Sequence, residues 1–149
     1  YEDELVFFVA PGSPLAERAE LHWEDLRSQT LVGPFGDPYW PQLWENLTHQ
    51  GFMAAKRVSL LGLEGVKLVV QAGGGVGVIF GAAVRREFAD GRLLPLHITD
   101  LSLPLNYYMV TRRLRQPRPI VDQFRSLLVR SVRDLFPLPK RQQSTVPAG

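Results

Sequence analysis

The glycines of residues 71–81 (QAGGGVGVIFG) are the first residues in the chain that could do chemistry. A dinucleotide-binding loop needs the pattern G-x-G-x-x-G after a strand and before a helix. Counted from Gly73 or from Gly75, the third glycine position holds Val78 or Phe80. The run also follows a predicted helix, and the free groups at the carboxyl end of a helix are carbonyls, which do not attract phosphate. The pattern therefore favours a helix stop and the start of a strand over a phosphate site.

Residue types that serve catalysis or metal binding are scattered along the chain. There is no cysteine, which excludes thiolate metal sites and cysteine nucleophiles. His22, His49 and His97 fall in different predicted elements without the spacing of metal ligands. No serine lies in a G-x-S-x-G elbow, and Ser13 sits in the turn-forming sequence Pro-Gly-Ser-Pro. We therefore expect neither an enzyme nor a bound metal or cofactor.

Two loops are better candidates for ligand binding. Residues 33–37 lie between the carboxyl end of a predicted strand and the amino end of a predicted helix, and residues 62–64 occupy a similar place further on. Open α/β sheets bind ligands at the carboxyl ends of their strands, and helix amino ends there offer free amides. Phe35 could add an apolar wall. The alternative is that the Gly-Pro-Phe-Gly sequence only shapes a turn, and the residues alone leave both interpretations open.

The elements that must position these loops alternate between strand and helix. The expected strands are Glu4–Ala10, Leu31–Val32, Arg57–Leu61, Val76–Phe80, Leu93–Ile98 and Leu105–Thr111. The expected helices are His22–Leu26, Tyr39–Gln50, Leu63–Ala72, Ala82–Ala89 and Ile120–Phe136. In the helix 82–89, we expect Val84 to face inward and Glu87 to face solvent. The alternation predicts an α/β domain with a mainly parallel sheet.

The composition excludes several classes of protein. The 149 residues fit one domain of ordinary size, and 45% of them are hydrophobic. No apolar run approaches the length of about 18–20 residues that spans a bilayer, and no leader peptide is visible. With 17 basic and 15 acidic residues, the chain is too balanced in charge to suggest nucleic-acid binding by this domain. The arginines of residues 112–118 are interpreted as a solvated connection.

The order of the segments resembles the effector-binding domain of LysR-type transcriptional regulators. The stretch ELVFFVAPGSPLAER resembles their hinge passage, and HWEDLRSQTLVGPFG resembles their helix, strand and ligand loop. The stretch GLEGVKLVVQAGGGVGVIFGAAVRREFADGRLLPL resembles their most recognisable run of helix, glycine turn, strand and helix. The stretches LNYYMVTRR and PRPIVDQFRSLLVRSVRD resemble their closing strand and helix. Together these pieces cover about residues 3–135.

The resemblance implies an α/β fold of the type 2 periplasmic-binding-protein kind, with a small-molecule effector between two lobes. Residues 1–11 would be a strand and hinge from a partial first lobe, and residues 12–97 would form a complete second lobe. Residues 98–136 would return to the first lobe with a closing strand and helix, and residues 137–149 would be a disordered tail. The loop that faces the effector would hold Gly33, Pro34, Phe35 and Gly36, and Phe80 would end a strand whose tip reaches the cleft.

The resemblance also implies partners and a location. The helix 39–50 and the strand 57–61 would form the surface used in side-by-side, antiparallel dimers, so we expect a homodimer or homotetramer in the cytoplasm, away from membranes. DNA would be bound only through an N-terminal winged helix-turn-helix that these residues do not include. Phe35, Tyr39 and Trp40 suggest an effector that is an aromatic or partly apolar carboxylic acid. The alternative is a lobe of a solute-binding protein that delivers a small molecule to a transporter.

Overall fold

The computed structural model describes residues 2–34, 39–49, 56–110 and 119–135. Its strands are β1 (Glu2–Val9), β2 (Thr30–Gly33), β3 (Lys56–Ser59), β4 (Val76–Phe80), β5 (Leu94–Leu96) and β6 (Pro104–Asn106). Its helices are α1 (Tyr39–His49), α2 (Leu63–Gln71), α3 (Gly81–Ala89) and α4 (Pro119–Leu135), with 3-10 turns η1 (Pro14–Glu17) and η2 (Trp23–Leu26). The chain divides into two compact units, Glu4–Pro104 and Tyr1–Asp3 with Leu105–Gly149.

The sheet is mixed, which corrects the expectation of a mainly parallel one. The strands follow the order β3-β2-β4-β1-β5, and β6 pairs with β1. β2 is parallel to both β3 and β4, with Val32 beside Val58 and Gly77. β1 is antiparallel to both β4 and β5, so that Phe8 lies beside Gly77 and Pro95. β2, β3 and β4 are parallel to one another because a helix carries the chain back between each strand and the next.

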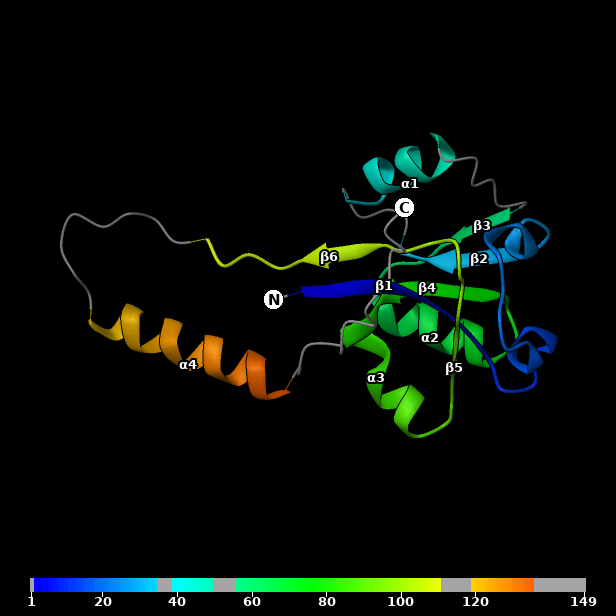
Figure 1. Ribbon diagram of the computed structural model, residues 1–149. Helices are drawn as coiled ribbons and strands as arrows, with labels where there is room; N and C mark the ends of the chain where they lie inside the picture. Colours follow the sequence, from blue (N-terminus) through cyan, green and yellow to red (C-terminus); the bar gives the residue numbers. More distant parts are fainter. Residues whose placement is uncertain (1, 35–38, 50–55, 111–118, 136–149) are drawn as a thin grey trace, which may run out of the picture. The chain divides into compact units, whose positions relative to one another are not determined.

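Helices cover both faces of the sheet in the unit Glu4–Pro104. The chain runs from β2 outward to β3 and then back past β2 to β4, so two right-handed crossovers place α1 and α2 on opposite faces. Figure 1 shows α1 on one side of the sheet and α2 and α3 on the other. The core lies between the sheet and the helices α2 and α3. Its fully buried side chains are Phe8, Val32, Val66, Val70, Ile79, Val84 and Leu93.

The glycine run ends α2 and leads into β4, as the sequence predicts. The amide of Gly73 donates to the carbonyl of Val70 at 2.9 Å, so it is not available to a phosphate. Gly73 has a φ of +82°, the left-handed conformation typical of a helix stop. Gly75, with a φ of +132°, passes so close to β2 that a Cβ there would overlap the backbone oxygen of Thr30. Glycine at these positions permits the backbone turn that ends α2 and the close approach of β4 to β2.

β3 is shorter than predicted at its carboxyl end. The sequence pattern predicts a strand to Leu61, but β3 ends at Ser59. The amide of Leu60 makes a last bond to the carbonyl of Gly33, at 3.0 Å. The chain then turns at Gly62, whose φ is +80°. Leu61 therefore lies beyond the sheet, in the connection to α2.

The unit that contains α4 exposes much apolar surface. The predicted strand 105–111 is reduced to β6, and the side chains of Tyr108 and Val110 are exposed; residue 111 lies outside the described residues. A segment with high strand propensity needs a neighbour on which to pair and pack. In α4, the apolar stripe follows the predicted helical period, but Ile120 and Phe124 are exposed.

Candidate ligand-binding site

The carboxyl ends of the three parallel strands meet at one edge of the sheet. β2 ends at Gly33, β3 at Ser59 and β4 at Phe80, and their parallel pairing places these ends on the same side. α3 begins directly after β4, and α2 begins four residues after the end of β3. The amino ends of both helices therefore lie at this edge. We call this region the carboxyl edge, and it comprises Gly33, Pro34, Ser59, Leu60, Leu61, Gly62, Leu63, Phe80 and Gly81.

The helices that follow β2 and β4 lie on opposite faces of the sheet. α1, the next helix after β2, lies on one face, and α3, the next helix after β4, lies on the other (Figure 1). Neighbouring parallel strands with diverging connections mark the switch point at which open α/β sheets bind ligands. The register pairs Val32 with Gly77, so two further residues bring Pro34 level with Ile79, one residue before Phe80. The topology brings two segments with predicted ligand-binding residues to one switch point.

Gly33, Pro34 and Phe80 all lie at this switch point. Gly33 and Pro34 are buried, and Phe80 is half-buried. Their backbone therefore shapes the edge, and the Phe80 side chain keeps some surface for contacts. Phe35 and Gly36, the other two predicted ligand-binding residues, lie outside the described residues.

Leu61 is a residue of the carboxyl edge that the sequence analysis placed wrongly, within a strand. Its side chain is 98% exposed. The useful signal in the sequence is an apolar residue directly before Gly62, at the end of a strand pattern and the start of a helix pattern. A leucine side chain this exposed buries almost no apolar surface against its own unit, so it contributes almost nothing to the stability of that unit. Its apolar surface is therefore available to a ligand.

The helices that begin at the carboxyl edge have no side-chain cap. The N-cap residue is Gly62 in α2 and Phe80 in α3, and neither has a side chain that can accept a hydrogen bond. The first-turn amides of a helix have no partner within the helix and lie at the positive end of its dipole. The amino end of α2 at this edge therefore suits a ligand with an anionic or hydrogen-bond-accepting group.

The chain enters and leaves the unit Glu4–Pro104 at the carboxyl edge. Leu5 of β1 lies beside Phe80 of β4, so the beginning of β1 lies at this edge. The amide of Leu5 donates to the carbonyl of Leu103 at 3.0 Å, which places the outgoing segment next to the incoming one. Both covalent links to the other unit therefore start beside the candidate site.

Residues 1–133 match the family model of the LysR substrate binding domain. The chain belongs to this family. The regulatory domain of CcmR from Synechocystis PCC6803, solved in complex with 2-PG, is similar over 87% of this chain and 63% of that one, with 20% identity and a TM-score of 0.65. The effector binding domain of QuiR, solved in complex with shikimate, is similar over 89% of this chain and 63% of that one, with 15% identity and a TM-score of 0.61.

A curated relative of this LysR substrate-binding domain is the uncharacterized HTH-type transcriptional regulator YwqM of Bacillus subtilis (strain 168). It is 25% identical over 96 residues, which are 64% of this chain and 33% of YwqM. The chain thus spans a third of this relative and less than two thirds of the two solved domains. The comparisons confirm the predicted family and the predicted class of fold, an α/β fold of the type 2 periplasmic-binding-protein kind.

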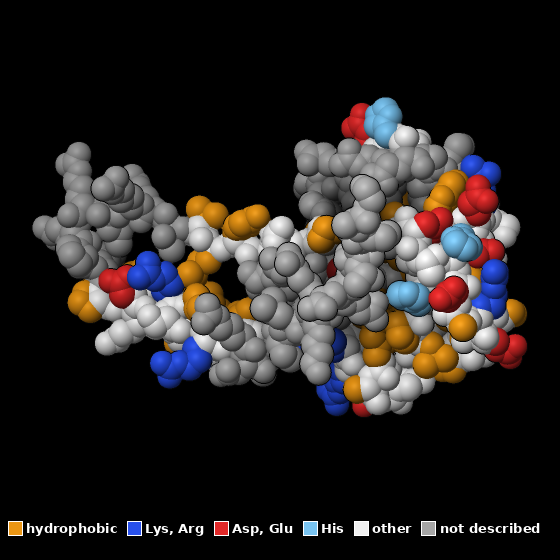
Figure 2. Space-filling model, in the orientation of Figure 1, with side chains coloured by type: hydrophobic (Ala, Val, Ile, Leu, Met, Phe, Trp, Pro, Cys, Tyr) orange, Lys and Arg blue, Asp and Glu red, His pale blue; other side chains and the backbone are white. Residues whose placement is uncertain are grey.

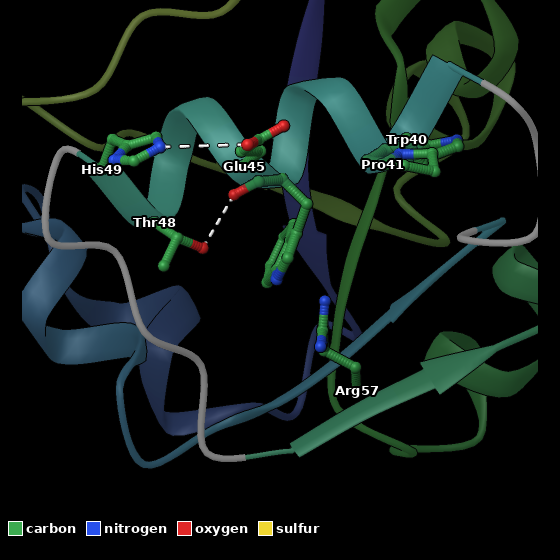
Figure 3. A pocket seen from close by; sticks show the side chains of 7 residues that line it. Trp40, Pro41, Glu45, Thr48, His49 and Arg57 are labelled. Carbon is green, nitrogen blue, oxygen red and sulfur yellow. Dashed lines mark hydrogen bonds and ion pairs between the residues drawn. The ribbon is translucent and has the colours of Figure 1, made fainter.

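This LysR substrate-binding domain also has a hollow of about 480 Å³ between α1 and β3 (Figure 3). Its lining residues are Trp40, Pro41, Trp44, Glu45, Thr48, His49 and Arg57. The guanidinium of Arg57 lies over the Trp44 ring, 4.9 Å from its centre. This hollow belongs to the elements that the sequence analysis predicts for a dimer surface. Its mixture of tryptophan and arginine is typical of protein–protein interfaces.

Trp40 has almost no surface to offer an effector. Its side chain is 1% exposed, although it stands in the first turn of α1 close to the end of β2. Its ring is used for packing, so Trp40 does not support the suggestion of an aromatic effector. The side chain of Tyr39 and all of Phe35 lie outside what the structure describes.

The remaining surface gives no sign of a metal site or a membrane segment. Within residues 2–34, 39–49, 56–110 and 119–135, no three His, Asp or Glu side chains come together in a group that could hold a metal ion. No helix in these ranges is long and apolar enough to cross a bilayer. Acidic, basic and histidine side chains of the described residues are interspersed on the face shown in Figure 2 and form no large patch of like charge there.

A buried ion pair links α2 and α3 of the domain. Lys67 Nζ lies 3.1 Å from Glu87 Oε1, and each side chain is 8% exposed. The prediction that Glu87 faces solvent is wrong, because α2 packs beside α3 and supplies the lysine. Burial alone would lower the pKa of Lys67 and raise that of Glu87. The hydrogen bonds to these groups outweigh burial, so the pKa of Lys67 lies above its usual 10.5 and that of Glu87 below its usual 4.5.

The ion pair predicts a pH dependence of stability. Because the folded-state pKa of Glu87 is lowered, its contribution is complete above pH 4.5 and is lost as the pH falls through the folded-state value. Because the folded-state pKa of Lys67 is raised, its contribution is complete below pH 10.5 and is lost as the pH rises through the folded-state value. The stability of the wild type relative to a Lys67→Met, Glu87→Leu variant should be constant between these limits and decline at lower pH. Urea unfolding at several pH values from about 3 to 7 measures this, and a difference that stays constant over the whole range would contradict it.

Proposed function

We propose that this chain is the effector-sensing part of a LysR-type regulator of transcription, and that it binds a small molecule at the carboxyl edge. The observation that carries the proposal is the switch point between β2 and β4, with Gly33 and Pro34 on one strand and Phe80 on the other. Membership of the LysR substrate-binding family and the effector complexes of the solved relatives support it. Phe35 and Gly36 belong to the proposed site through their places in the loop after β2.

The mechanism we propose is closure of two lobes about the hinge strands. Residues 12–97 form the second lobe, and residues 1–11 and 98–136 belong to the first lobe or to the links. The division of the chain into Glu4–Pro104 and a second unit supports such an arrangement. A ligand that contacts both lobes stabilises the closed arrangement by the difference between its affinities for the two states. In the regulator as a whole, this change alters DNA binding through an N-terminal helix-turn-helix domain in the cytoplasm.

The proposed effector is a carboxylic acid with an apolar or aromatic part. The amino end of α2, which has no side-chain cap, suits its carboxylate. The exposed side chain of Leu61 and the half-buried ring of Phe80 suit its apolar part. The 2-PG and shikimate bound to CcmR and QuiR support a small-molecule effector in general and do not choose the compound.

Leu61 allows a test that does not disturb the fold. A thermal-shift screen of the full-length protein with small carboxylic acids, including benzoate and shikimate, should find a compound that raises the melting temperature. Leu61→Ser should leave the melting temperature of the free protein unchanged, because the side chain is 98% exposed. It should weaken binding of that compound by about tenfold or more, which is the effect of losing one buried leucine contact.

Leu68→Ser is the matched control for this test. Leu68 lies on α2, is 65% exposed and stands outside the carboxyl edge, so this variant should bind the compound like the wild type. Equal binding by all three proteins would remove Leu61 from the site. The absence of any stabilising compound in the panel would contradict the proposed effector class.

We further propose that the hollow between α1 and β3 faces a second copy of the chain in a homodimer or homotetramer. The exposed Arg57 and the half-buried Trp44 at the hollow provide the polar and aromatic contacts that such an interface uses. Sedimentation analysis of the full-length protein measures its oligomeric state, and a monomer at micromolar concentration would contradict this part of the proposal.

A further inference from the structure

The turn between β3 and α2 places a hydroxyl group beside the features of the proposed site. This turn has the sequence Ser-Leu-Leu-Gly, residues 59–62, and we call it the β3–α2 turn. Ser59 is the exposed last residue of β3, and Gly62 is the N-cap residue of α2. An extended chain rises by about 3.3–3.6 Å per residue, so the three steps from Ser59 to Gly62 span about 11 Å at most. A small acid that meets the amino end of α2 is therefore close to the Ser59 hydroxyl.

The side chains of Ser59 and Leu61 point away from the core of the unit. Leu60, which stands between them, is half-buried and packs against the core cluster. Its amide donates to the carbonyl of Gly33 at 3.0 Å, so the backbone here continues the ladder of β2 and β3. Successive side chains of an extended chain point to opposite sides. The hydroxyl of Ser59 and the apolar side chain of Leu61 are therefore exposed together, on the side away from the core.

Among the described residues that define the carboxyl edge, Ser59 alone has a side chain that can make a hydrogen bond. The others are glycines, leucines, a proline and a phenylalanine. The charged side chains on either side of the β3–α2 turn in the chain have contacts elsewhere. Arg57 points into the hollow beside α1 and lies over the Trp44 ring (Figure 3), and Glu64 Oε1 lies 2.6 Å from Lys67 Nζ. Since a hydroxyl both donates and accepts, its natural partner is a group that also does both, such as another hydroxyl.

We infer that Ser59 is a specificity-determining residue, and that its hydroxyl selects an effector with a hydroxyl group on the apolar part. This inference rests on the proposed function, which places the carboxylate of the effector at the amino end of α2 and its apolar part on Leu61. Ser59 is held by its pairing with Gly33 in the ladder of β2 and β3, so its hydroxyl is presented from a rigid element. An acid without the hydroxyl group leaves Ser59 bonded to water and loses the net gain of one hydrogen bond.

Titration calorimetry of the full-length protein with benzoate and its three monohydroxy derivatives tests the inference. In the wild type, at least one hydroxybenzoate should bind about three- to tenfold more tightly than benzoate, which is the net gain of one hydrogen bond. Ser59→Ala should abolish this preference, so that the same hydroxybenzoate binds no more tightly than benzoate. The substitution should leave the fold intact, because the side chain of Ser59 is exposed.

Three further variants keep the experiment interpretable. Ser59→Thr retains a hydroxyl and suits a strand, so it should retain the preference for the hydroxybenzoate. Ser28→Ala is the matched control, because Ser28 is also exposed but stands just before β2, at the end of that strand away from the carboxyl edge. It should leave the preference unchanged. Leu61→Ser should weaken the binding of benzoate and the hydroxybenzoate alike, because Leu61 is proposed to contact the part that they share.

The possible outcomes separate the two proposals. A preference that survives in Ser59→Ala, an equal loss of affinity for both acids in that variant, or a wild type that binds all four acids equally would overturn the role of Ser59. In these cases, binding of benzoate that depends on Leu61 would still support the proposed function. If none of the four acids binds, the proposed effector class fails and the inference about Ser59 fails with it.

Discussion

Replacing Gly75 by alanine should lower the free energy of unfolding by about 3–5 kcal/mol, which combines a strained backbone conformation with overpacking. Gly75 has a φ of +132°, which side chains rarely tolerate, and an added Cβ would overlap the backbone oxygen of Thr30. Thr30 cannot retreat, because the next residue, Leu31, pairs with Val76 in the register of β2 and β4. The clash therefore acts on the strand pair that forms the switch point. Urea unfolding at neutral pH measures the loss.

Gly73→Ala is the matched control for this prediction. Gly73 also has a positive φ, +82°, but no heavy atom lies within 4 Å of the position that a Cβ would take. Alanine there should cost only the backbone term, about 1 kcal/mol. Equal losses in the two variants would show that the close approach to β2 is not the reason for glycine at position 75.

Replacing Phe8 by alanine should cost about 3–5 kcal/mol, the usual loss for a buried phenylalanine. Phe8 is completely buried and is a member of the core cluster between the sheet and the helices. Its ring also packs edge-on against Phe88 of α3, with 6.1 Å between ring centres. Since Phe8 stands on β1 beside β4, the loss of its ring would also loosen the packing of β4, the strand that ends at the carboxyl edge.

Leu61→Ala is the control at an exposed position. It should leave the free energy of unfolding within about 0.5 kcal/mol of the wild type.

Gly77 provides a double-mutant test of this packing. A Cβ at Gly77 would overlap the ring of Phe8, so Gly77→Val alone should destabilise by about 1–3 kcal/mol. In the Phe8→Ala background, the valine should fill part of the cavity, and the double variant should be more stable than the sum of the single losses predicts. Strict additivity would show that the two positions do not share one space.

The sequence predicted those parts of the fold that depend on local patterns. β4 is Val76–Phe80 in both the prediction and the structure, because a short continuous apolar run after a glycine turn is typical of a buried strand. α2 and α3 agree within one residue at each end, since capping and helical period are local. The strand predicted over 105–111 was too long, because its residues have strand propensity but the described part of the chain pairs only β6.

The candidate site was predictable only as separate pieces. From the sequence, Gly33 and Pro34 could be assigned to a strand end and Phe80 to another. That the two ends are neighbours depends on β4 lying next to β2 rather than next to β3, which no short stretch encodes. The prediction of Glu87 on a solvent face failed for a similar reason. Helical periodicity gives the face of a side chain relative to its own helix, and the neighbouring helix decides whether that face is covered.

The sequence by itself determined the class of fold, the family and the glycine turn, because each rests on residues close together in the chain. The helix stop at Gly73 follows from a backbone conformation that glycine adopts freely. Only the tertiary structure decided the mixed sheet, the switch point, the exposure of Leu61 and the burial of Lys67 with Glu87. These features depend on which elements pack together, and packing is set by contacts between residues far apart in the sequence.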